Sequence, residues 1–404
     1  MGISLGLVGL GAFGSGFADL FKSHPLVDRI ALCDREPERV EKFAKKESWQ
    51  DKFDPKDAYD SLDAICESDL DALVIITQPW LHAPQCIQAM ESGKHVYSAV
   101  PIISVPDGDE ILDWCDKLVD CCKRTGRYYM LGETTYYRPN AQFCRRKAGE
   151  GAFGNFVFAE GEYFHNYLDL FKVQKHRLNS KAGREWKERA KVYRERKVVS
   201  GPMHYPTHST SGPVCVMNAH AVKVNAHAYR SSLDNAYFKG GISNETALFK
   251  MSNNATVRIC EFREAAGHLG AHETFRVVGT LGTYAENWWK EIVSQEPPGK
   301  TDYTQMTDEE MRDPFPDEVA QAFNKIFNAR GHKGDINKDF TPRGHGGSHP
   351  YLVHEFVDAV ANDRQPAINI WEAVRYMAMG VMAHKSALQD GTTLDVPDWG
   401  DAPA

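Results

Sequence analysis

Short apolar runs alternate with amphipathic stretches through about the first 130 residues. Apolar runs that predict strands lie at residues 3–8, 29–33, 71–77, 93–97 and 128–131. Helical patterns separate these runs, and the longest spans about Pro106 to Thr125. Strands that are apolar throughout and alternate with helices are typical of a doubly wound parallel sheet. We therefore expect an α/β domain of this type over residues 1–132.

Residues 133–404 follow a different pattern. Predicted strands, separated by Gly, Asn and Ser turns, lie at Phe153–Tyr163, Val222–Tyr229, Glu245–Met251, Ala255–Phe262 and Glu273–Val278. Predicted helices span Pro206–Met217, His349–Ala361 and Trp371–Leu388. Residues 172–199, dense in Lys and Arg, predict an irregular, exposed basic arm, and residues 293–346, rich in Pro, Gly and charge, a long surface excursion. We expect an α+β domain with an open, mainly antiparallel sheet.

Composition narrows the class of protein. The 404 residues suffice for two domains, and 42% hydrophobic with 25% charged residues is a globular composition. A net charge of −8 argues against nucleic-acid binding and against anionic membranes, and no apolar run reaches transmembrane length. The glycine-rich turn near residue 9 leaves no room for a preceding signal peptide. Nine scattered cysteines favour free thiols and a cytoplasmic location.

The first predicted strand runs into a Gly-x-Gly-x-x-Gly turn formed by Gly9, Gly11 and Gly14, with Ala12 and Phe13 between the last two. In such a fingerprint the glycines allow the tight turn, the approach of a pyrophosphate and close helix packing. The helix that follows directs free N–H groups and its positive dipole end at the phosphates. The turn therefore predicts dinucleotide binding.

The second predicted strand ends at Asp34, about 20 residues beyond the glycines. A carboxylate there accepts hydrogen bonds from a ribose 2′-hydroxyl and repels a 2′-phosphate, which favours NAD over NADP. Arg35 beside it leaves the alternative open, because an arginine can bind a phosphate. Ligands of such sheets bind at the carboxyl ends of the strands. The other cofactor-binding candidates in those loops are Thr77, Gln78, Trp80, His82, Val100, Pro101 and Glu133.

Three stretches besides the glycine turn carry a family resemblance: 77–82, 93–101, and Gly132-Glu133 with Arg138 beyond it. Together they resemble the Gfo/Idh/MocA family of sugar-active, nicotinamide-dependent oxidoreductases. The resemblance implies a Rossmann domain followed by a domain whose open sheet often forms an oligomer interface. A homo-oligomer, dimer or tetramer, is therefore expected.

The chain departs from this family at the catalytic lysine. Ordinary members carry Glu-Lys-Pro after Gly-Lys-His-Val, whereas here Ala99 and Val100 precede Pro101. Another group must then move the proton. The segment His204-Tyr205-Pro206-Thr207-His208 is similar to one in the NAD-dependent α-N-acetylgalactosaminidases and related redox glycosidases of the same family. Glu133 with Tyr137, and the glycine-flanked His345, fit that branch as well.

These observations define the candidate site. The catalytic candidates are Tyr205, His208, His204 and Tyr137, and the substrate-binding candidates are His165, Arg177, His345 and Arg138. Each also has a plain packing, turn or solvated-surface interpretation. Arg177 and its basic neighbours are an anionic-sugar contact, an oligomer arm or simply a solvated face. No metal is expected, because His204 and His208 lack the acid of a His-Glu-x-x-His helix and a third ligand.

Two enzymatic functions follow from the resemblance. The first is a redox-neutral glycoside hydrolase, in which NAD takes a hydride from carbon 3 of a sugar, the carbon 2 proton is lost, the aglycone is eliminated, water adds and the hydride returns. The second is a net sugar or glycoside 3-dehydrogenase with exchangeable NAD(H). A third, non-enzymatic function is a sensor or scaffold that kept the fold after losing the lysine. The absent lysine supports the third function, whereas the dense cluster of His and Tyr residues opposes it. Of the two enzymatic functions we favour the first.

Overall fold

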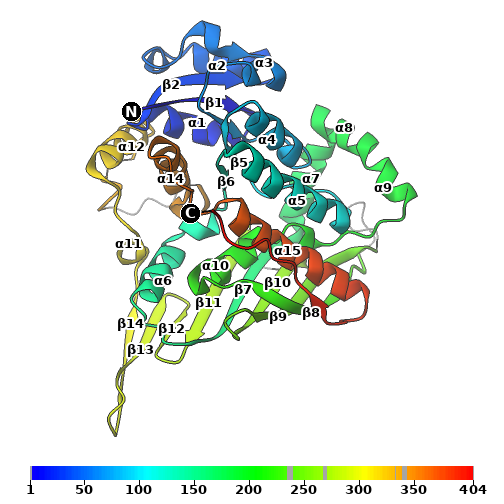
Figure 1. The fold of residues 1–404 in the computed structure, drawn as a ribbon, viewed down its shortest axis with the longest axis vertical. Helices are drawn as coiled ribbons and strands as arrows, with labels where there is room; N and C mark the ends of the chain where they lie inside the picture. The colour runs from blue at the N-terminus through cyan, green and yellow to red at the C-terminus, as the bar shows by residue number, and fades with distance from the viewer. Residues whose placement is uncertain (1, 234–239, 267–270, 333, 339–343, 404) are drawn as a thin grey trace.

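The N-terminal domain of the computed structural model is built on a parallel sheet of six strands in the order β3-β2-β1-β4-β5-β6 (Figure 1). The structure describes residues 2–233, 240–266, 271–332, 334–338 and 344–403. The strands are β1 (Ile3–Val8), β2 (Val27–Cys33), β3 (Ala58–Tyr59), β4 (Ala72–Ile75), β5 (His95–Ser98) and β6 (Tyr129–Leu131). The connecting helices are α1 (Gly14–Ser23), α2 (Pro37–Ala44), α3 (Leu62–Cys66), α4 (His82–Glu91) and α5 (Gly108–Thr125).

Burial explains why these strands are apolar along their whole length. The side chains of β4 are all buried, and Leu5 of β1 is fully shielded from solvent. Helices cover both faces of such a sheet, so no strand needs a polar side. The strand order reverses between β1 and β4, and a crevice at the carboxyl ends of strands at such a point is where ligands bind. The predicted doubly wound α/β domain is confirmed.

The second domain contains a nine-stranded sheet in the order β14-β13-β12-β11-β7-β10-β9-β8-β15. Its strands are β7 (Phe156–Asn166), β8 (Ala221–Arg230), β9 (Ile242–Met251), β10 (Thr256–Ala265), β11 (Ala271–Gly279), β12 (Gly282–Ala285), β13 (Trp288–Ser294), β14 (Lys300–Gln305) and β15 (Leu394–Asp395). Every pairing is antiparallel except that of β7 with β10, so the predicted mainly antiparallel sheet is confirmed.

Helices lie on one face of this sheet. α6 (Pro139–Gly149), α10 (Thr207–Met217) and α15 (Ile370–Leu388) gather on the side toward the N-terminal domain (Figure 1). α10 packs across β7 and β11, while α15 packs on β8 and on α5 of the first domain. These contacts bring the start of α10 close to the carboxyl ends of the parallel strands.

The predicted irregular arm at 172–199 is wrong in its secondary structure. The segment is helical, forming most of α7 (Tyr167–Asn179) and all of α8 (Lys181–Arg189) and α9 (Lys191–Glu195). Its basic residues are largely exposed, but two aromatic residues pack: Tyr193 is buried, and Trp186 stacks on Trp80 of the first domain. The density of Lys and Arg hid these sparse packing positions.

The predicted surface excursion at 293–346 is only partly at the surface. β13 and β14 form a hairpin that projects from the body of the molecule (Figure 1). In contrast, α12 (Asp317–Ala329) packs against α1 and buries Phe323 completely, and the short α11 (Asp308–Met311) precedes it. Residues 333 and 339–343 of this stretch lie outside the described residues. α14 (His349–Ala361) follows as predicted.

The structure also bears on the predictions about the cysteines and about membrane-spanning segments. All nine cysteines are free, and eight of them are buried. Within the described ranges, no helix has the length and apolar character that a membrane crossing requires.

Candidate active site

The glycine turn has the geometry that a dinucleotide needs. Gly9 has φ of 94°, and a Cβ added there would lie 2.3 Å from the Ile76 carbonyl oxygen. A Cβ on Gly14 would lie 2.0 Å from the carbonyl oxygen of Gly9, so both positions tolerate glycine alone. Residues 11–13 lie at or near the surface at the start of α1. The turn thus presents open backbone at a helix N-terminus, which fits the phosphates of NAD.

Asp34 is fixed beside this turn. One carboxylate oxygen accepts a 2.7 Å bond from Leu10 N–H, and the other accepts a 3.0 Å bond from Glu36 N–H. The carboxylate is nearly buried, and the Arg39 guanidinium lies 3.5 Å from it. Asp34 therefore holds a negative charge where the fingerprint places the ribose 2′-hydroxyl.

The other predicted cofactor loops are tied to each other. His82 is buried, and its Nδ1 lies 2.9 Å from the Pro101 carbonyl oxygen, which joins the loop after β4 to the turn after β5. The Trp80 ring stacks on Trp186 of α8 at 4.9 Å between centroids. His82 and Trp80 thus hold the two loops in place. Thr77, Gln78 and Val100 lie in the same loops.

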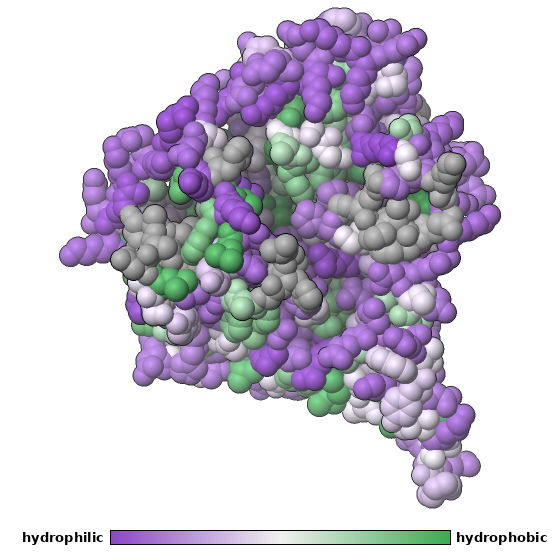
Figure 2. Space-filling model, turned by 180° about the vertical axis from the view of Figure 1, so that it is seen from behind, coloured by the Kyte–Doolittle hydropathy of each residue, from purple (hydrophilic) through white to green (hydrophobic). Residues whose placement is uncertain are grey.

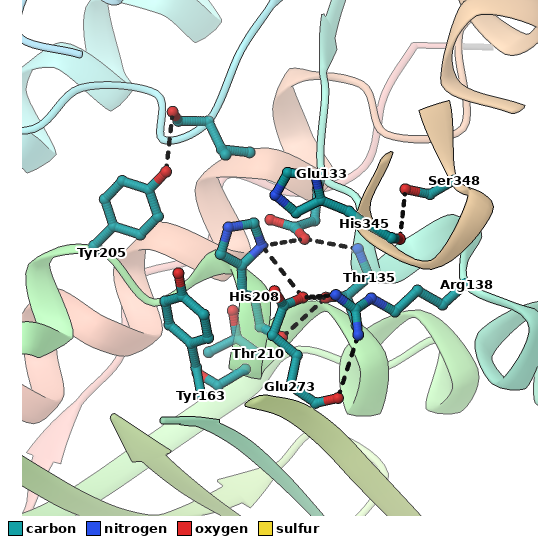
Figure 3. A network of polar contacts seen from close by, with 12 residues as sticks. Glu133, Thr135, Arg138, Tyr163, Tyr205, His208, Thr210, Glu273, His345 and Ser348 are labelled. Carbon is teal, nitrogen blue, oxygen red and sulfur yellow. Dashed lines mark hydrogen bonds and ion pairs between the residues drawn. The ribbon is translucent and has the colours of Figure 1, made fainter. Parts of the chain in front are cut away.

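His208, in the first turn of α10, is the centre of a buried polar cluster (Figure 3). Its Nδ1 lies 2.8 Å from Glu133 Oε1, and Glu273 Oε2 of β11 lies 3.9 Å away. Glu133 lies two residues beyond the end of β6 and also accepts a 2.9 Å bond from Thr135 N–H. Arg138, at the start of α6, pairs with Glu273 at 2.6 Å. Three segments that are distant in sequence, at residues 133–138, 208 and 273, thus meet in this cluster.

The two carboxylates decide the charge of this histidine. Burial alone would lower the pKa of His208, but the charges of Glu133 and Glu273 outweigh it and raise that pKa to about 9. Burial raises the pKa of Glu133, whereas the charge and hydrogen bond of His208 lower it more, so the net shift is downward. At neutral pH the cluster therefore holds an imidazolium between carboxylates.

Two tyrosine rings flank His208. The Tyr163 ring of β7 meets the His208 ring edge-on at 4.9 Å between centroids, and the Tyr205 ring lies at 5.7 Å, both on the same side of His208 (Figure 3). The Tyr205 hydroxyl donates a 3.3 Å bond to the carbonyl oxygen of Val100, the position where the family lysine is absent. Burial raises the pKa of both tyrosines, so they carry hydroxyl protons at neutral pH.

His345 approaches from the other side of the cluster. Its ring lies nearly parallel to that of His208 at 6.4 Å, and its Nδ1 lies 3.1 Å from His349 Nε2. The backbone is left-handed at His345 and Gly346. The Phe13 ring of the glycine turn lies 5.6 Å from the rings of His345 and His349, so His345 lies between the glycine turn and the His208 cluster.

Two catalytic candidates do not join this cluster. His204 is buried against His384 at 4.4 Å between ring centroids, and a Cβ on Gly108 would lie 3.3 Å from it, so it faces α5 and α15. The Tyr137 ring stacks on Tyr351 of α14 at 6.2 Å and lies in the core. The start of α10 at Thr207 explains the first case, because it separates the two histidines of the segment.

The remaining substrate candidates lie around the cluster. His165 Nε2 bonds the Tyr163 hydroxyl at 2.7 Å, and burial lowers the pKa of His165 to about 4. Arg177 of α7 is exposed, and its charge lowers the pKa of Tyr205 against the larger effect of burial. Arg138 is engaged by Glu273, so it orients a carboxylate of the cluster.

Sequence reasoning missed Glu273, Tyr163 and Thr135. Glu273 had a detectable signal, because it shares the buried face of β11 with Phe275 and Val277, where an acid needs a partner. Tyr163 pairs in register with Glu273 across the strands. No cluster of three or more His, Cys, Asp or Glu residues suited to a metal ion occurs in the described part of the chain.

The surface is hollowed near the junction of the two domains. Figure 2 shows this depression between the N-terminal domain at the top and the sheet domain below, with pale and apolar residues inside it. A depression between a cofactor domain and a sheet that carries polar side chains is a common place for a small-molecule site.

Each of the two domains matches a known protein family. Residues 3–133 match the oxidoreductase family with an NAD-binding Rossmann fold, Gfo/Idh/MocA, and residues 236–402 match the C-terminal domain of glycosyl hydrolase 109. A glycosyl hydrolase family 109 protein of Porphyromonas gingivalis is 32% identical over 173 residues, 42% of this chain and 36% of that protein. An alpha-N-acetylgalactosaminidase of Bacteroides fragilis is 30% identical over 224 residues, 54% and 49% of the two chains. The chain thus covers half or less of these relatives.

Solved structures agree on the fold. A levoglucosan dehydrogenase in complex with NADH and levoglucosan superposes with a TM-score of 0.71 at 17% identity, covering 98% of this chain and all of that one. An NAD-binding oxidoreductase of Klebsiella pneumoniae gives a TM-score of 0.72 at 15% identity with the same coverage. Both parts of the chain therefore have a family match: the N-terminal part is similar to the NAD-binding Rossmann domain of the Gfo/Idh/MocA oxidoreductases, and the C-terminal part to the C-terminal domain of glycosyl hydrolase 109.

Proposed function

We propose that this protein is an NAD-dependent, redox-neutral glycoside hydrolase that acts at carbon 3 of a sugar. The observation that carries the proposal is the buried His208 side chain held between Glu133 and Glu273 beside Tyr205, in a chain whose N-terminal domain has an NAD-type glycine turn. The names of the glycosyl hydrolase 109 relatives support the same class.

The carboxylates of the site argue against ordinary glycoside hydrolysis. That chemistry needs two free carboxyl groups, one on each side of the scissile bond. Glu133 and Glu273 are instead buried and bonded to His208, Thr135 and Arg138. They serve the histidine, so bond cleavage in this site needs another driving force.

The redox route supplies that force. Bound NAD would accept the hydride of carbon 3 and later return it, and the glycine turn with Asp34 would hold it. The carbon 3 ketone acidifies the carbon 2 proton, whose removal expels the aglycone with its bonding electrons, and water then adds at carbon 1.

His208 acts on the oxygen where negative charge develops. A fixed cation in a buried site stabilises an alkoxide or enolate strongly and needs no reorganisation during the reaction. Because its pKa is raised to about 9, His208 is a donor to the carbon 3 oxygen at neutral pH. Glu133 and Glu273 hold that cation in place.

Tyr205 is the proposed proton carrier. Its hydroxyl lies beside Val100, where the lysine of ordinary family members would stand, and close to the imidazolium that stabilises a phenolate. Tyr163 and His165 form a bonded pair next to it and position the substrate. Arg177 at the exposed rim gives an anionic sugar or leaving group a binding partner.

The proposal includes a homo-oligomer in the cytoplasm. Helices cover one face of the nine-stranded sheet. The other, outer face carries the apolar side chains of Leu248 and of the stacked pair Phe164–Phe262. A second copy that covers this apolar strip would form the interface. Nine free thiols fit a reducing compartment.

A glycoside panel tests the function. The purified protein with NAD is expected to release the aglycone from at least one α- or β-linked aryl glycoside without accumulating NADH. Released aglycone is read by absorbance or chromatography, and NADH by its absorbance at the same time. Stoichiometric NADH without aglycone would identify a net sugar dehydrogenase instead.

A further inference from the structure

Two arginines follow the carboxyl end of β2. The ribose of the adenosine half of the cofactor would bind at this place, beside the glycine turn. Arg35 comes directly after Asp34, and Arg39 lies one turn further on in α2. Arginines at this place are the groups that accommodate a 2′-phosphate in NADP enzymes, through bidentate hydrogen bonds. Taken alone, this pair would favour NADP and oppose the selection of NAD by Asp34.

Both arginines form ion pairs with carboxylates. Arg39 pairs with Glu36 at 2.6 Å and lies 3.5 Å from Asp34. Arg35 Nη1 donates to both carboxylate oxygens of Glu185, at 2.9 and 3.0 Å. With three carboxylates and two guanidinium groups, the cluster has a net charge of −1 at the ribose end.

Glu185 reaches this place from the other domain. It lies on α8, which other contacts hold against the Rossmann domain (Figure 1). Trp186 stacks on Trp80 at 4.9 Å, and the Tyr193 hydroxyl donates a 2.8 Å bond to Glu110. The aromatic stack fixes the neighbouring residue of the same helix, so the Glu185 carboxylate is delivered to Arg35 in a defined position.

We propose that Glu185 is a cofactor-specificity residue: by pairing with Arg35 it withdraws the cation that would bind a 2′-phosphate and adds a second negative charge beside Asp34. The second domain thereby takes part in selecting NAD over NADP. This role concerns cofactor binding alone and does not depend on the reaction that the sugar undergoes.

The test compares Glu185→Gln with the unmodified protein. The amide is isosteric and keeps a hydrogen bond to Arg35, but it removes the charge. Both partners are about 43–44% exposed, so screening is close to that of water. One unit charge at about 4 Å in water corresponds to about fivefold in affinity. We expect the Kd for NADP to fall at least about fivefold while the Kd for NAD changes less than twofold, measured by calorimetry without sugar.

Two controls keep the result specific. Glu188→Gln changes the same helix at an exposed carboxylate that pairs with Lys191, and it should leave both constants unchanged. In the double variant Glu185→Gln with Arg35→Gln, the gain for NADP should disappear, because it runs through Arg35. An unchanged NADP affinity in Glu185→Gln, or a gain that persists in the double variant, would overturn the proposal. Circular dichroism confirms that each variant is folded.

Discussion

Replacing His208 by Gln, or Glu133 by Gln, is expected to reduce turnover by about 100-fold or more while NAD remains bound. The magnitude is that of a positioned acid or base. In the first variant no cation faces the carbon 3 oxygen. In the second the imidazolium loses the carboxylate 2.8 Å away, so the pKa of His208 falls toward its ordinary value. Initial rates of aglycone release and calorimetry with NAD measure the two effects.

The pH dependence carries the same prediction with a definite sign. The pKa of His208 is raised to about 9, above its ordinary 6.5, so the imidazolium is present below 9 and is lost above it. We expect kcat/KM to fall about tenfold per pH unit above pH 9, and in Glu133→Gln this limb should move to lower pH. The pairing of His208 with Glu133 also contributes to the free energy of unfolding. This contribution is complete below pH 6.5 and is lost as the pH rises through 9.

Glu245→Gln is the matched control. Glu245 of β9 and His384 of α15 form a second buried pair at 2.7 Å, separate from the His208 cluster. Breaking either pair leaves a buried group without its partner, so both variants should lose stability to a similar extent. Only Glu133→Gln should shift the pH limb. Equal turnover and identical pH profiles in the two variants would show that Glu133 has a purely structural role.

Tyr205→Phe is expected to reduce turnover by a similar factor of about 100. The change removes one hydroxyl, which bonds the Val100 carbonyl at 3.3 Å, and leaves the ring packing unchanged. Tyr163→Phe should cost less, because the Tyr163 hydroxyl is already bonded to His165 at 2.7 Å. Single-turnover rates with saturating NAD distinguish the two variants.

Adding the family lysine provides a check on this assignment. Val100→Lys in the Tyr205→Phe background should not restore activity, because the cluster is built around a tyrosine and an imidazolium. Full activity in Tyr205→Phe, or recovery through Lys at position 100, would assign the proton transfer to a different group.

The fold could be predicted from the sequence because its signals are local. Strands such as 71–77 are apolar throughout, and the glycine turn lies between a strand and a helix, so the parallel domain follows from pattern alone. The helices at 172–199 could not be seen in this way. Their stability comes from a few contacts with another domain, such as Trp186 on Trp80, and these are tertiary.

The residues that meet in the His208 cluster were predictable as neighbours where they follow strands or lie in a motif. His208, Tyr205 and Glu133 were found for that reason and meet in the structure. His204 was grouped with them by spacing, but the helix begins only at Thr207, so its side chain faces the opposite way. Glu185 could not be found, because only the packing of α8 brings it to Arg35.

The most direct test of the proposed chemistry uses a glycoside deuterated at carbon 3. If the hydride is removed and returned, aglycone release shows a primary isotope effect, no net NADH accumulates, and the product keeps deuterium at carbon 3. With deuterium at carbon 2 instead, the label should exchange with solvent. Aglycone release without an isotope effect at carbon 3, with the carbon 2 label retained, would contradict a redox-neutral mechanism.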